Sequence, residues 1–295
     1  MNLVFSSDNN YAQHLGVALC SLFENNKDDH FNIFVIDGGI DEENKRKLAF
    51  LEGKYNFKIN YVKPDKELFK DVYISGHISE ATYYRLSVGE LLPHSIDKII
   101  YLDCDIVIVG KIRELWNVSL GDYILAAVTE AGYVDYSRLG IKTKEDYFNA
   151  GVIILDLKKW REQNIGQKCF DFIKNNPDEL VIWDQDALNQ VLCGSWKKLD
   201  TRFNVMTQIK ETINYSVIIH FNTWVKPWHY LCNHPQRSQY YKYLRMTMWK
   251  PFKPEIPTLK QFCRYYYYIF FNNKTQIFIR KNILNFLGIK KDVLK

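Results

Sequence analysis

No stretch of this 295-residue sequence approaches the roughly 18 apolar residues that are needed to cross a bilayer. Residues 1–8 contain neither a basic segment nor a long apolar segment, so we expect no signal peptide. The sequence also lacks internal repeats and low-complexity linkers. From these absences we expect a cytoplasmic protein without a transmembrane helix.

Paired cysteine motifs are missing as well. The six cysteines are scattered and form no C-x-x-C pair, so we predict reduced thiols. Cys232-Asn233-His234 brings together one thiol and one imidazole, which are too few ligands for a zinc site. The full set is Cys20, Cys104, Cys169, Cys193, Cys232 and Cys263.

The composition is that of an ordinary globular protein, with 47% hydrophobic and 25% charged residues. The net charge of +5 is unevenly distributed, however. Residues 260–295 contain eight Lys or Arg and one acid, a local charge of +7, so the preceding 259 residues sum to −2. The sequence therefore describes a nearly neutral body followed by a basic tail.

Short apolar segments alternate with helical patterns along the body. This alternation predicts an α/β fold with helices on both faces of a sheet. Ligands bind such sheets at the carboxyl ends of strands, where Asp8, Asp103 and His220 each lie. We expect strands near residues 3–5, 31–36, 57–62, 99–102, 106–109, 123–128, 151–155 and 217–219, and helices near 12–22, 41–51, 79–91, 156–175 and 184–193.

The most informative motif is Asp103-Cys104-Asp105, which follows the apolar run 98–102. Alternate side chains of an extended segment point the same way, so the two carboxylates can converge. Hard divalent cations prefer oxygen ligands, and a diphosphate can complete their coordination. The pair predicts a site that holds a divalent cation against a phosphorylated donor; the alternative is an exposed acidic loop.

Four further segments accompany the pair: Asp8-Asn9-Asn10-Tyr11, residues 77–86, residues 147–151 with 184–186, and residues 220–228. In this order the five motifs resemble the retaining nucleotide-sugar transferases of glycosyltransferase family 8. The likeness is greatest to the bacterial enzymes that build lipopolysaccharide and lipooligosaccharide outer cores. It extends from residue 2 to about residue 230 and implies a GT-A fold, in which helices flank a Rossmann-like mixed sheet.

The resemblance implies a metal site. Asp103 and Asp105 match the D-x-D metal ligands, and His220 matches the histidine that completes the site. Two carboxylates with an imidazole suit Mn²⁺ better than Ca²⁺, with Mg²⁺ as the alternative. Without the resemblance His220 would be interpreted as a hydrogen-bonded core histidine. Lys226 matches the lysine that faces the diphosphate and offsets the charge of the leaving group.

The resemblance also implies how a UDP-sugar is bound. Asp8 and Asn10 match positions that bind the uridine, and Tyr11 matches the aromatic residue that packs on the base. His77 and Cys104 match positions near the nucleotide-sugar. An acidic acceptor suits the N3–H of uracil, which favours a UDP donor. The alternative for this segment is that Asn9 or Asn10 is the N-cap of the first helix.

Five positions match residues around the donor sugar. Without the resemblance, Arg85 would be interpreted as a surface charge and Asp184 as an N-cap. Two departures from the galactosyltransferase pattern leave the sugar open, because Glu130 replaces an aspartate and Thr223 replaces a glycine. UDP-galactose and UDP-glucose are close competitors, with UDP-galactose ahead. The five positions are Arg85, Asn149, Ala150, Asp184 and Gln185.

These positions imply transfer of a hexose to an acceptor hydroxyl with retention of configuration. Two inversions would require a carboxylate nucleophile at the anomeric carbon. The catalytic positions are Gln185, a poor nucleophile, and Asp184, which is assigned to sugar hydroxyls. We therefore favour a same-face route, in which the departing phosphate oxygen takes the acceptor proton.

Other functions remain open. They are a UDP-sugar hydrolase, a UDP-glucose-dependent protein or glycan glucosyltransferase, another transferase on the same scaffold, and an inactive membrane-associated scaffold protein. A decayed enzyme would be expected to lose a metal ligand, and Asp103, Asp105 and His220 are all retained.

We expect a catalytic domain over residues 1–250 and a basic, aromatic tail over residues 251–295. Clustered aromatic residues followed by lysines are typical of a segment at an anionic membrane surface. The alternatives are a helix packed on the catalytic domain and single-stranded nucleic-acid binding. We favour the membrane and expect no nucleic-acid partner. The protein would then be peripheral on the inner face of the cytoplasmic membrane, where a lipid-linked glycan acceptor is available.

Overall fold

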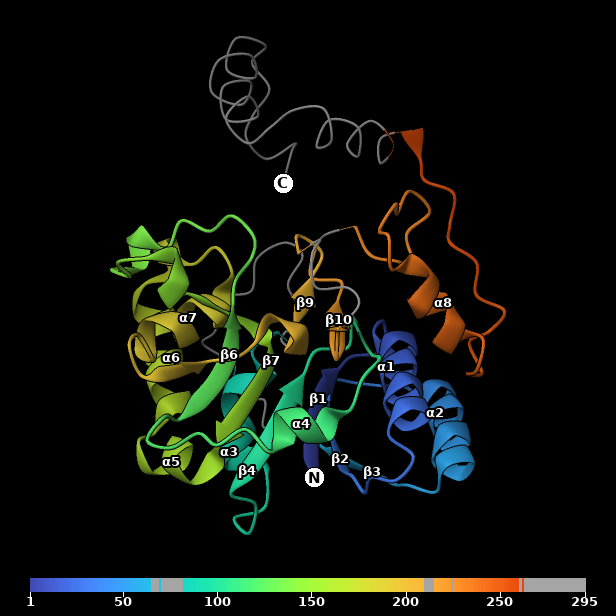
Figure 1. The fold of residues 1–295 in the computed structure, drawn as a ribbon, viewed down its shortest axis with the longest axis horizontal. Helices are drawn as coiled ribbons and strands as arrows, with labels where there is room; N and C mark the ends of the chain where they lie inside the picture. The colour runs from blue at the N-terminus through green and yellow to red at the C-terminus, as the bar shows by residue number, and fades with distance from the viewer. Residues whose placement is uncertain (65–68, 70–81, 210–214, 224, 260–261, 263–295) are drawn as a thin grey trace. The chain divides into compact units, whose positions relative to one another are not determined.

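A computed structural model describes residues 1–64, 69, 82–209, 215–223, 225–259 and 262 (Figure 1). The chain divides into two units, whose relative positions are not determined. Residues 1–224 and 235–251 form the first unit, and residues 225–234 and 252–295 form the second. His77 and nearly all of the basic tail lie outside the described residues. The expected boundary at residue 250 and the membrane role of the tail therefore stay predictions.

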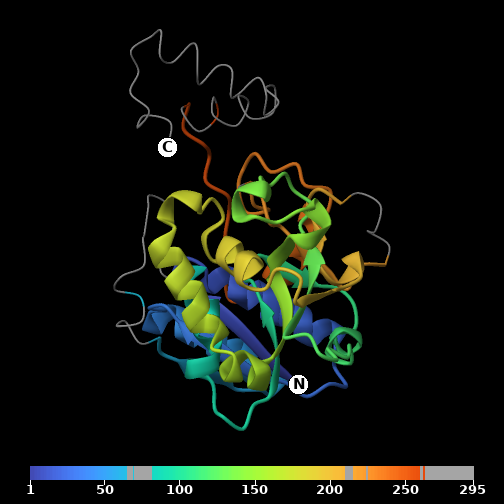
Figure 2. The same ribbon diagram turned by 90° about the vertical axis from the view of Figure 1, so that its left-hand side faces the viewer.

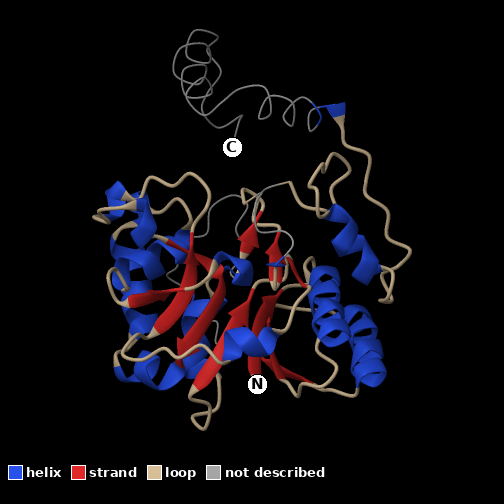
Figure 3. Cartoon of the chain, viewed as in Figure 1, coloured by secondary structure: helices blue, strands red, loops and turns tan. Residues whose placement is uncertain are grey.

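The first unit is built on a mixed sheet, whose strands are drawn in red among blue helices in Figure 3. The sheet has seven strands in the order β3-β2-β1-β4-β7-β6-β8. β1–β4 run parallel, and β7 is antiparallel to both β4 and β6. A smaller sheet has the order β5-β10-β9. The strands are β1 (Asn2–Ser7), β2 (Asn32–Asp37), β3 (Ile59–Val62), β4 (Lys98–Leu102), β5 (Ile106–Ile108), β6 (Leu125–Thr129), β7 (Phe148–Asp156), β8 (Trp196–Lys198), β9 (Val205–Met206) and β10 (Ile218–His220).

Helices lie on both sides of the larger sheet (Figure 1, Figure 2). α1 packs on β1 and β5 beside α2 and α8, whereas α5 and α7 pack on β4 and β7 beside α3 and α6. This arrangement confirms the α/β fold that the sequence predicts. The helices are α1 (Ala12–Asn25), α2 (Glu42–Tyr55), α3 (Val88–Leu91), α4 (Ile112–Trp116), α5 (Leu157–Glu162), α6 (Ile165–Asn175), α7 (Trp183–Val191) and α8 (Arg237–Leu244).

Local sequence explains the central elements. The consecutive apolar residues of β1 are fully buried, as expected for a strand covered on both faces. α2 begins after Asp41, whose side chain accepts a hydrogen bond from Asn44 N at 2.7 Å and so caps the N-terminus of the helix. The helix ends at Asn56, which takes the left-handed conformation with φ 53°.

Several predicted boundaries were wrong. The helix expected over residues 156–175 is interrupted at Asn164, whose φ of 52° separates α5 from α6. β7 is longer than expected because it begins at Phe148, and β8 and β9 were not predicted. Within the described part of the helix expected over 79–91, a 3-10 turn over Tyr84–Ser87 precedes α3.

Two predicted absences can be compared with the described part of the chain. None of its helices is both long enough and apolar enough to pass through a bilayer. Five of the six cysteines fall within the described residues, and all five are free thiols, in agreement with the prediction.

Candidate active site

The candidate site lies where neighbouring strands of the large sheet end. Asp8 follows β1 and Asp103 follows β4, and these two strands are adjacent and parallel. β2 and β4 lie on opposite sides of β1, so this is the point where the order of the strands reverses. β7 runs the other way, which brings its first residues to the same edge: Asp103 N donates to Gly151 O at 2.8 Å.

The small sheet delivers the histidine. β10 pairs antiparallel with β5, with His220 opposite Ile106. Phe221 N then donates to Asp105 O at 2.9 Å, which places the end of β10 beside the carboxylate pair. Asp103, Asp105 and His220 are thereby brought together from two sheets, although more than a hundred residues separate the aspartates from the histidine.

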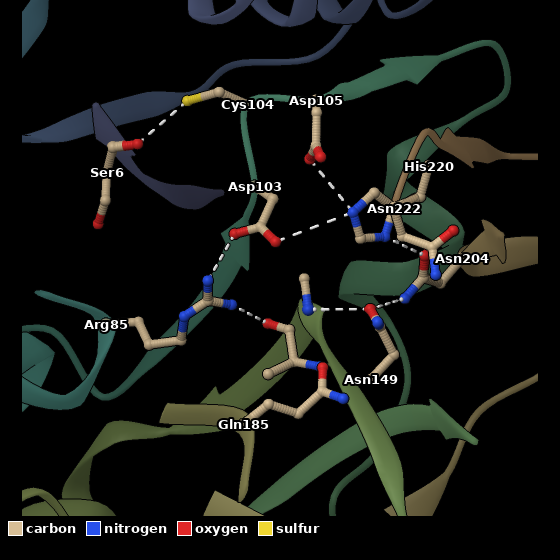
Figure 4. Close-up of polar contacts among 12 residues, drawn as sticks. Ser6, Arg85, Asp103, Cys104, Asp105, Asn149, Gln185, Asn204, His220 and Asn222 are labelled. Atoms are coloured by element: carbon tan, nitrogen blue, oxygen red, sulfur yellow. Dashed lines mark hydrogen bonds and ion pairs between the residues drawn. The ribbon is translucent and has the colours of Figure 1, made fainter. Parts of the chain in front are cut away.

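The three side chains could hold a cation between them (Figure 4). Nε2 of His220 lies 3.2 Å from Asp105 Oδ1 and 3.8 Å from Asp103 Oδ2. One ligand atom from each residue lies within 4.8 Å of the other two, and the described residues contain no other such group of His, Cys, Asp or Glu side chains. Two carboxylates and one imidazole form a donor set that suits Mn²⁺.

Gly151 leaves room for this group. A Cβ at position 151 would lie 2.3 Å from Cε1 of His220 and 2.6 Å from Oδ2 of Asp103. Both distances are shorter than real Cβ contacts, so any side chain here would displace the ligands. The glycine therefore fits a site that holds a metal ion.

Arg85 connects the carboxylate pair to the neighbouring acid Asp184. Its guanidinium donates to Asp103 Oδ1 at 2.9 Å and to Ala150 O at 2.6 Å, and its Nε pairs with Asp184 Oδ2 at 2.6 Å. Arg85 is buried, so the surface-charge interpretation is wrong. Burial lowers its pKa, but Asp103 and Asp184 outweigh burial and raise the pKa above its ordinary value.

Asp184 is also buried, and it lies inside the first turn of α7 rather than at its N-cap, which is Ile182. Burial raises the pKa of Asp184 to about 6, although the charge of Arg85 acts in the opposite direction. The N-cap interpretation of Asp184 is therefore wrong.

Amide and carboxylate groups next to Arg85 form one hydrogen-bonded network. Gln185 Oε1 accepts from Ala150 N at 3.0 Å, and Gln185 Nε2 donates to Glu130 Oε2 at 3.3 Å. Asn149 Nδ2 donates to the same Glu130 oxygen at 2.7 Å, while Gly132 N donates to Glu130 Oε1 at 2.8 Å. Three donors therefore hold the Glu130 carboxylate. Four residues that the resemblance places near the donor sugar lie side by side, namely Glu130, Asn149, Ala150 and Gln185.

The segment after β1 also takes a defined shape. Asp8 Oδ1 accepts from Tyr11 N at 2.9 Å, and the Tyr11 ring is 38% exposed. The alternative that Asn9 or Asn10 is the N-cap is wrong: Tyr11 is the N-cap residue, without a side-chain hydrogen bond. Asn9 binds α2 instead, since its amide donates to Asp41 Oδ2 at 2.8 Å.

Comparison with known proteins decides the family. Residues 2–232 match the family model described as glycosyl transferase family 8. The chain belongs to this family. General stress protein A of Bacillus subtilis (strain 168) is 36% identical over 84% of the chain and 94% of its own length. Lipopolysaccharide 1,2-glucosyltransferase of Escherichia coli (strain K12) is 26% identical over 86% and 80%, respectively.

A solved structure supports the same conclusion. The galactosyltransferase LgtC, crystallised with donor and acceptor sugar analogs, aligns with a TM-score of 0.76 at 28% identity. The alignment covers 88% of this chain and 99% of that one. The protein therefore has the GT-A fold of a family 8 glycosyltransferase, as the sequence predicts.

One pocket of this family 8 fold runs from the end of β1 to the carboxylate pair. Cys104 lies in it, and its thiol donates to Ser6 O at 3.1 Å. Burial, followed by the charges of Asp103 and Asp105, raises the pKa of the Cys104 thiol well above its ordinary value, which favours the protonated form. The pocket is lined by Ser6, Ser7, Asp8, Tyr11, Thr82, Arg85, Tyr101, Asp103, Cys104 and Asp105.

For other predicted residues the position relative to the site is not described. His77 lies outside the described residues, and Lys226 belongs to the second unit. Thr223 follows β10 in the first unit and is half-buried. Asn204, which contacts His220, was not predicted from the sequence. Asparagine is common in turns, so nothing in the local sequence distinguishes Asn204 from a turn residue.

Proposed function

We propose that this family 8 protein is a metal-dependent, retaining hexosyltransferase that uses a UDP-hexose as donor. The observation that carries the proposal is the group of Asp103, Asp105 and His220, whose ligand atoms lie within 4.8 Å of one another. Mn²⁺ is the proposed cation, with Mg²⁺ as the alternative, and it would neutralise the diphosphate so that UDP can leave. Buried Arg85 adds a fixed positive charge next to Asp103.

The nucleotide would lie along the pocket that begins after β1. Asp8 can accept the N3–H of uracil, and the exposed face of Tyr11 can stack on the base. Asn10 is exposed two residues after Asp8, where it can reach the uridine. Lys226 and His77 keep the diphosphate and nucleotide-sugar roles that the family resemblance implies.

The network around Glu130 would position the hexose. Asp184 and Arg85 form a buried pair beside Ala150, and the Gln185 amide is held between Ala150 N and Glu130. With its oxygen engaged by a backbone N–H, Gln185 is poorly suited to attack the anomeric carbon. This supports the same-face route, in which the acceptor proton passes to the departing phosphate oxygen.

The donor sugar is proposed to be galactose, with glucose as the competitor. Glu130 replaces the aspartate of the close galactosyltransferases, and the backbone N–H of Gly132 helps to hold its longer side chain. Thr223 replaces a glycine at the diphosphate end. The acceptor is proposed to be a glycan, with a lipid-linked one favoured because the basic, aromatic residues 251–295 suit an anionic membrane surface.

The direct test is release of UDP without an acceptor. UDP-galactose, UDP-glucose, UDP-N-acetylgalactosamine and UDP-N-acetylglucosamine would each be incubated with the protein and Mn²⁺, with EDTA as the metal-free control. We expect slow, Mn²⁺-dependent hydrolysis of UDP-galactose or UDP-glucose. If none of the four is hydrolysed or bound, the inactive-scaffold function would replace this proposal.

A further inference from the structure

Asn204 contacts the imidazole that faces the carboxylate pair. Its side chain is fully buried. Oδ1 of Asn204 lies 3.0 Å from Nδ1 of His220, and Nδ2 of Asn204 donates to Asn149 Oδ1 at 2.8 Å (Figure 4). Asn204 therefore joins the histidine to the network of the sugar site.

Asn149 and Asn204 belong to a row of hydrogen bonds, and the groups at the two ends of this row fix the orientation of both side-chain amides. Gly151 N can only donate, and it lies 3.0 Å from Asn149 Oδ1. The carboxylate of Glu130 accepts from Asn149 Nδ2 at 2.7 Å. Asn149 Oδ1 must therefore accept from Asn204 Nδ2, which turns Asn204 Oδ1 toward His220.

The consequence concerns the proton on the imidazole. Asn204 Oδ1 is an acceptor, so Nδ1 of His220 must carry a proton, and in the neutral imidazole Nε2 then presents its lone pair to Asp103 and Asp105. The carboxylates act in the opposite sense, because a carboxylate oxygen at 3.2 Å would attract a proton onto Nε2. A proton on Nε2 would prevent that nitrogen from binding a metal ion.

We propose that Asn204 is a positioning residue of the metal site, which holds His220 in the Nδ1–H tautomer against the pull of the carboxylates. The inference rests on the proposed metal-dependent function. It also couples two parts of the site, because the chain of hydrogen bonds that orients Asn204 begins at Glu130, a donor-sugar position. Loss of such a supporting hydrogen bond typically weakens metal binding about 10- to 100-fold.

The test measures the tautomer and metal binding separately. Nitrogen-15 NMR of histidine in the full-length, metal-free protein at one fixed pH reports which ring nitrogen of His220 is protonated, and a His220→Gln variant identifies its signals. Mn²⁺ affinity is measured by electron paramagnetic resonance. We expect protonated Nδ1 in the wild type and in Asn204→Asp, which keeps an acceptor. In Asn204→Leu we expect protonated Nε2 and about 10- to 100-fold weaker Mn²⁺ binding.

Asn26 provides the matched control. It is another fully buried asparagine, and its side chain binds Leu22 O, Gly110 O and Ile112 N, away from the site. Asn26→Leu should destabilise the fold while His220 and the Mn²⁺ affinity stay as in the wild type. The proposal is overturned if wild-type His220 carries its proton on Nε2, or if folded Asn204→Leu keeps both the tautomer and the affinity.

The wild-type result stands even if Asn204→Leu does not fold. A wild type with protonated Nδ1 that fails to bind Mn²⁺ would instead overturn the metal-dependent function, and with it the metal-directed role of Asn204. The two failures are therefore distinguishable.

Discussion

Asp105 and Asp186 are both buried aspartates in D-x-D sequences, yet their surroundings differ. Asp186 is fully buried and surrounded by donors. They are Arg138 NH2 at 2.6 Å, Tyr147 OH at 2.6 Å, Val181 N at 2.7 Å and Ile182 N at 2.5 Å. Asp105 instead faces Nε2 of His220 at 3.2 Å, with Asp103 on the other side of that nitrogen.

The difference separates a structural carboxylate, Asp186, from Asp105, which is proposed to bind a metal ion. Four donors neutralise Asp186, so it stabilises the loop and the helix that it joins. With the proposed tautomer of His220, the ligand atoms of Asp103, Asp105 and His220 would instead all present electron pairs to the same point, an arrangement that a cation would stabilise. The fold maintains this second arrangement at a cost in stability, which is expected of a functional site.

The largest effect is expected from Asp105→Asn. Loss of a charged ligand should reduce Mn²⁺-dependent UDP release by about 10³-fold or more, because metal stabilisation of the leaving group contributes several kcal/mol. Thermal unfolding without metal should be unchanged or shifted upward, since repulsion between carboxylates is relieved. Asp122→Asn, in an exposed turn, is the control for loss of a surface charge. Full activity of Asp105→Asn would show that the site is misassigned.

The opposite pattern is expected for Asp186→Asn. An uncharged amide would leave half-buried Arg138 without its fully buried counter-charge, so the free energy of unfolding should fall by about 3 kcal/mol. Mn²⁺ binding should persist in the protein that remains folded. Urea unfolding and Mn²⁺ titration measure the two quantities. A stable Asp186→Asn variant would remove the contrast with Asp105.

The buried carboxyl group of Asp184 should make the free energy of unfolding depend on pH. Its folded pKa of about 6 lies above the unfolded value of 3.8, so the folded state binds more protons between these values. Its contribution to the free energy of unfolding should therefore fall as pH rises from about 4 to 6, by on the order of 3 kcal/mol. The side-chain amide in the variant Asp184→Asn does not titrate. The free energy of unfolding of the wild type minus that of the variant should therefore fall between about pH 4 and 6, as measured by urea unfolding at each pH.

Asp41 supplies the control of opposite sign. Hydrogen bonds from Asn44 N and the Asn9 side chain lower its pKa, so its contribution appears as pH rises and is lost as pH falls below the unfolded value. The free energy of unfolding of the wild type minus that of Asp41→Asn should therefore rise with pH. A pH-independent difference for Asp184→Asn would contradict the burial of an ionisable carboxyl at that position.

The smallest effect is expected from a single methyl group at Gly151. Gly151→Ala should weaken Mn²⁺ binding about tenfold, or about 1.4 kcal/mol, because the Cβ would displace His220 and Asp103. Gly53→Ala is the matched control: it lies in α2 with nothing within 4 Å of the new Cβ. It should raise stability by up to about 1 kcal/mol without changing metal affinity. Wild-type affinity in Gly151→Ala would mean that the cluster is looser than described.

Features encoded by neighbouring residues were predictable from the sequence. Apolar runs located most strands, and the end of a strand located Asp8, Asp103 and His220. The N-cap by Asp41 was predictable because a cap depends on residues within one turn. The N-cap alternative for Asn9 was wrong because the partners of its side chain are not local. They are Asp41 and Asn44, at the start of α2.

Features that depend on pairing between distant strands were not predictable. The reversed direction of β7 brings Gly151 to Asp103, and the pairing of β10 with β5 brings His220 to Asp105. The role of Asn204 depends on both, because it binds His220 on one side and Asn149 on the other. No local pattern of residues encodes these contacts.

The most direct measurement is Mn²⁺ titration of the wild type, Asp105→Asn and Asp186→Asn by electron paramagnetic resonance in the presence of UDP. If Asp103, Asp105 and His220 hold the cation, the wild type and folded Asp186→Asn should bind one Mn²⁺ with similar affinity, and Asp105→Asn should lose most of that affinity. Equal Mn²⁺ binding by Asp105→Asn and the wild type would contradict the account.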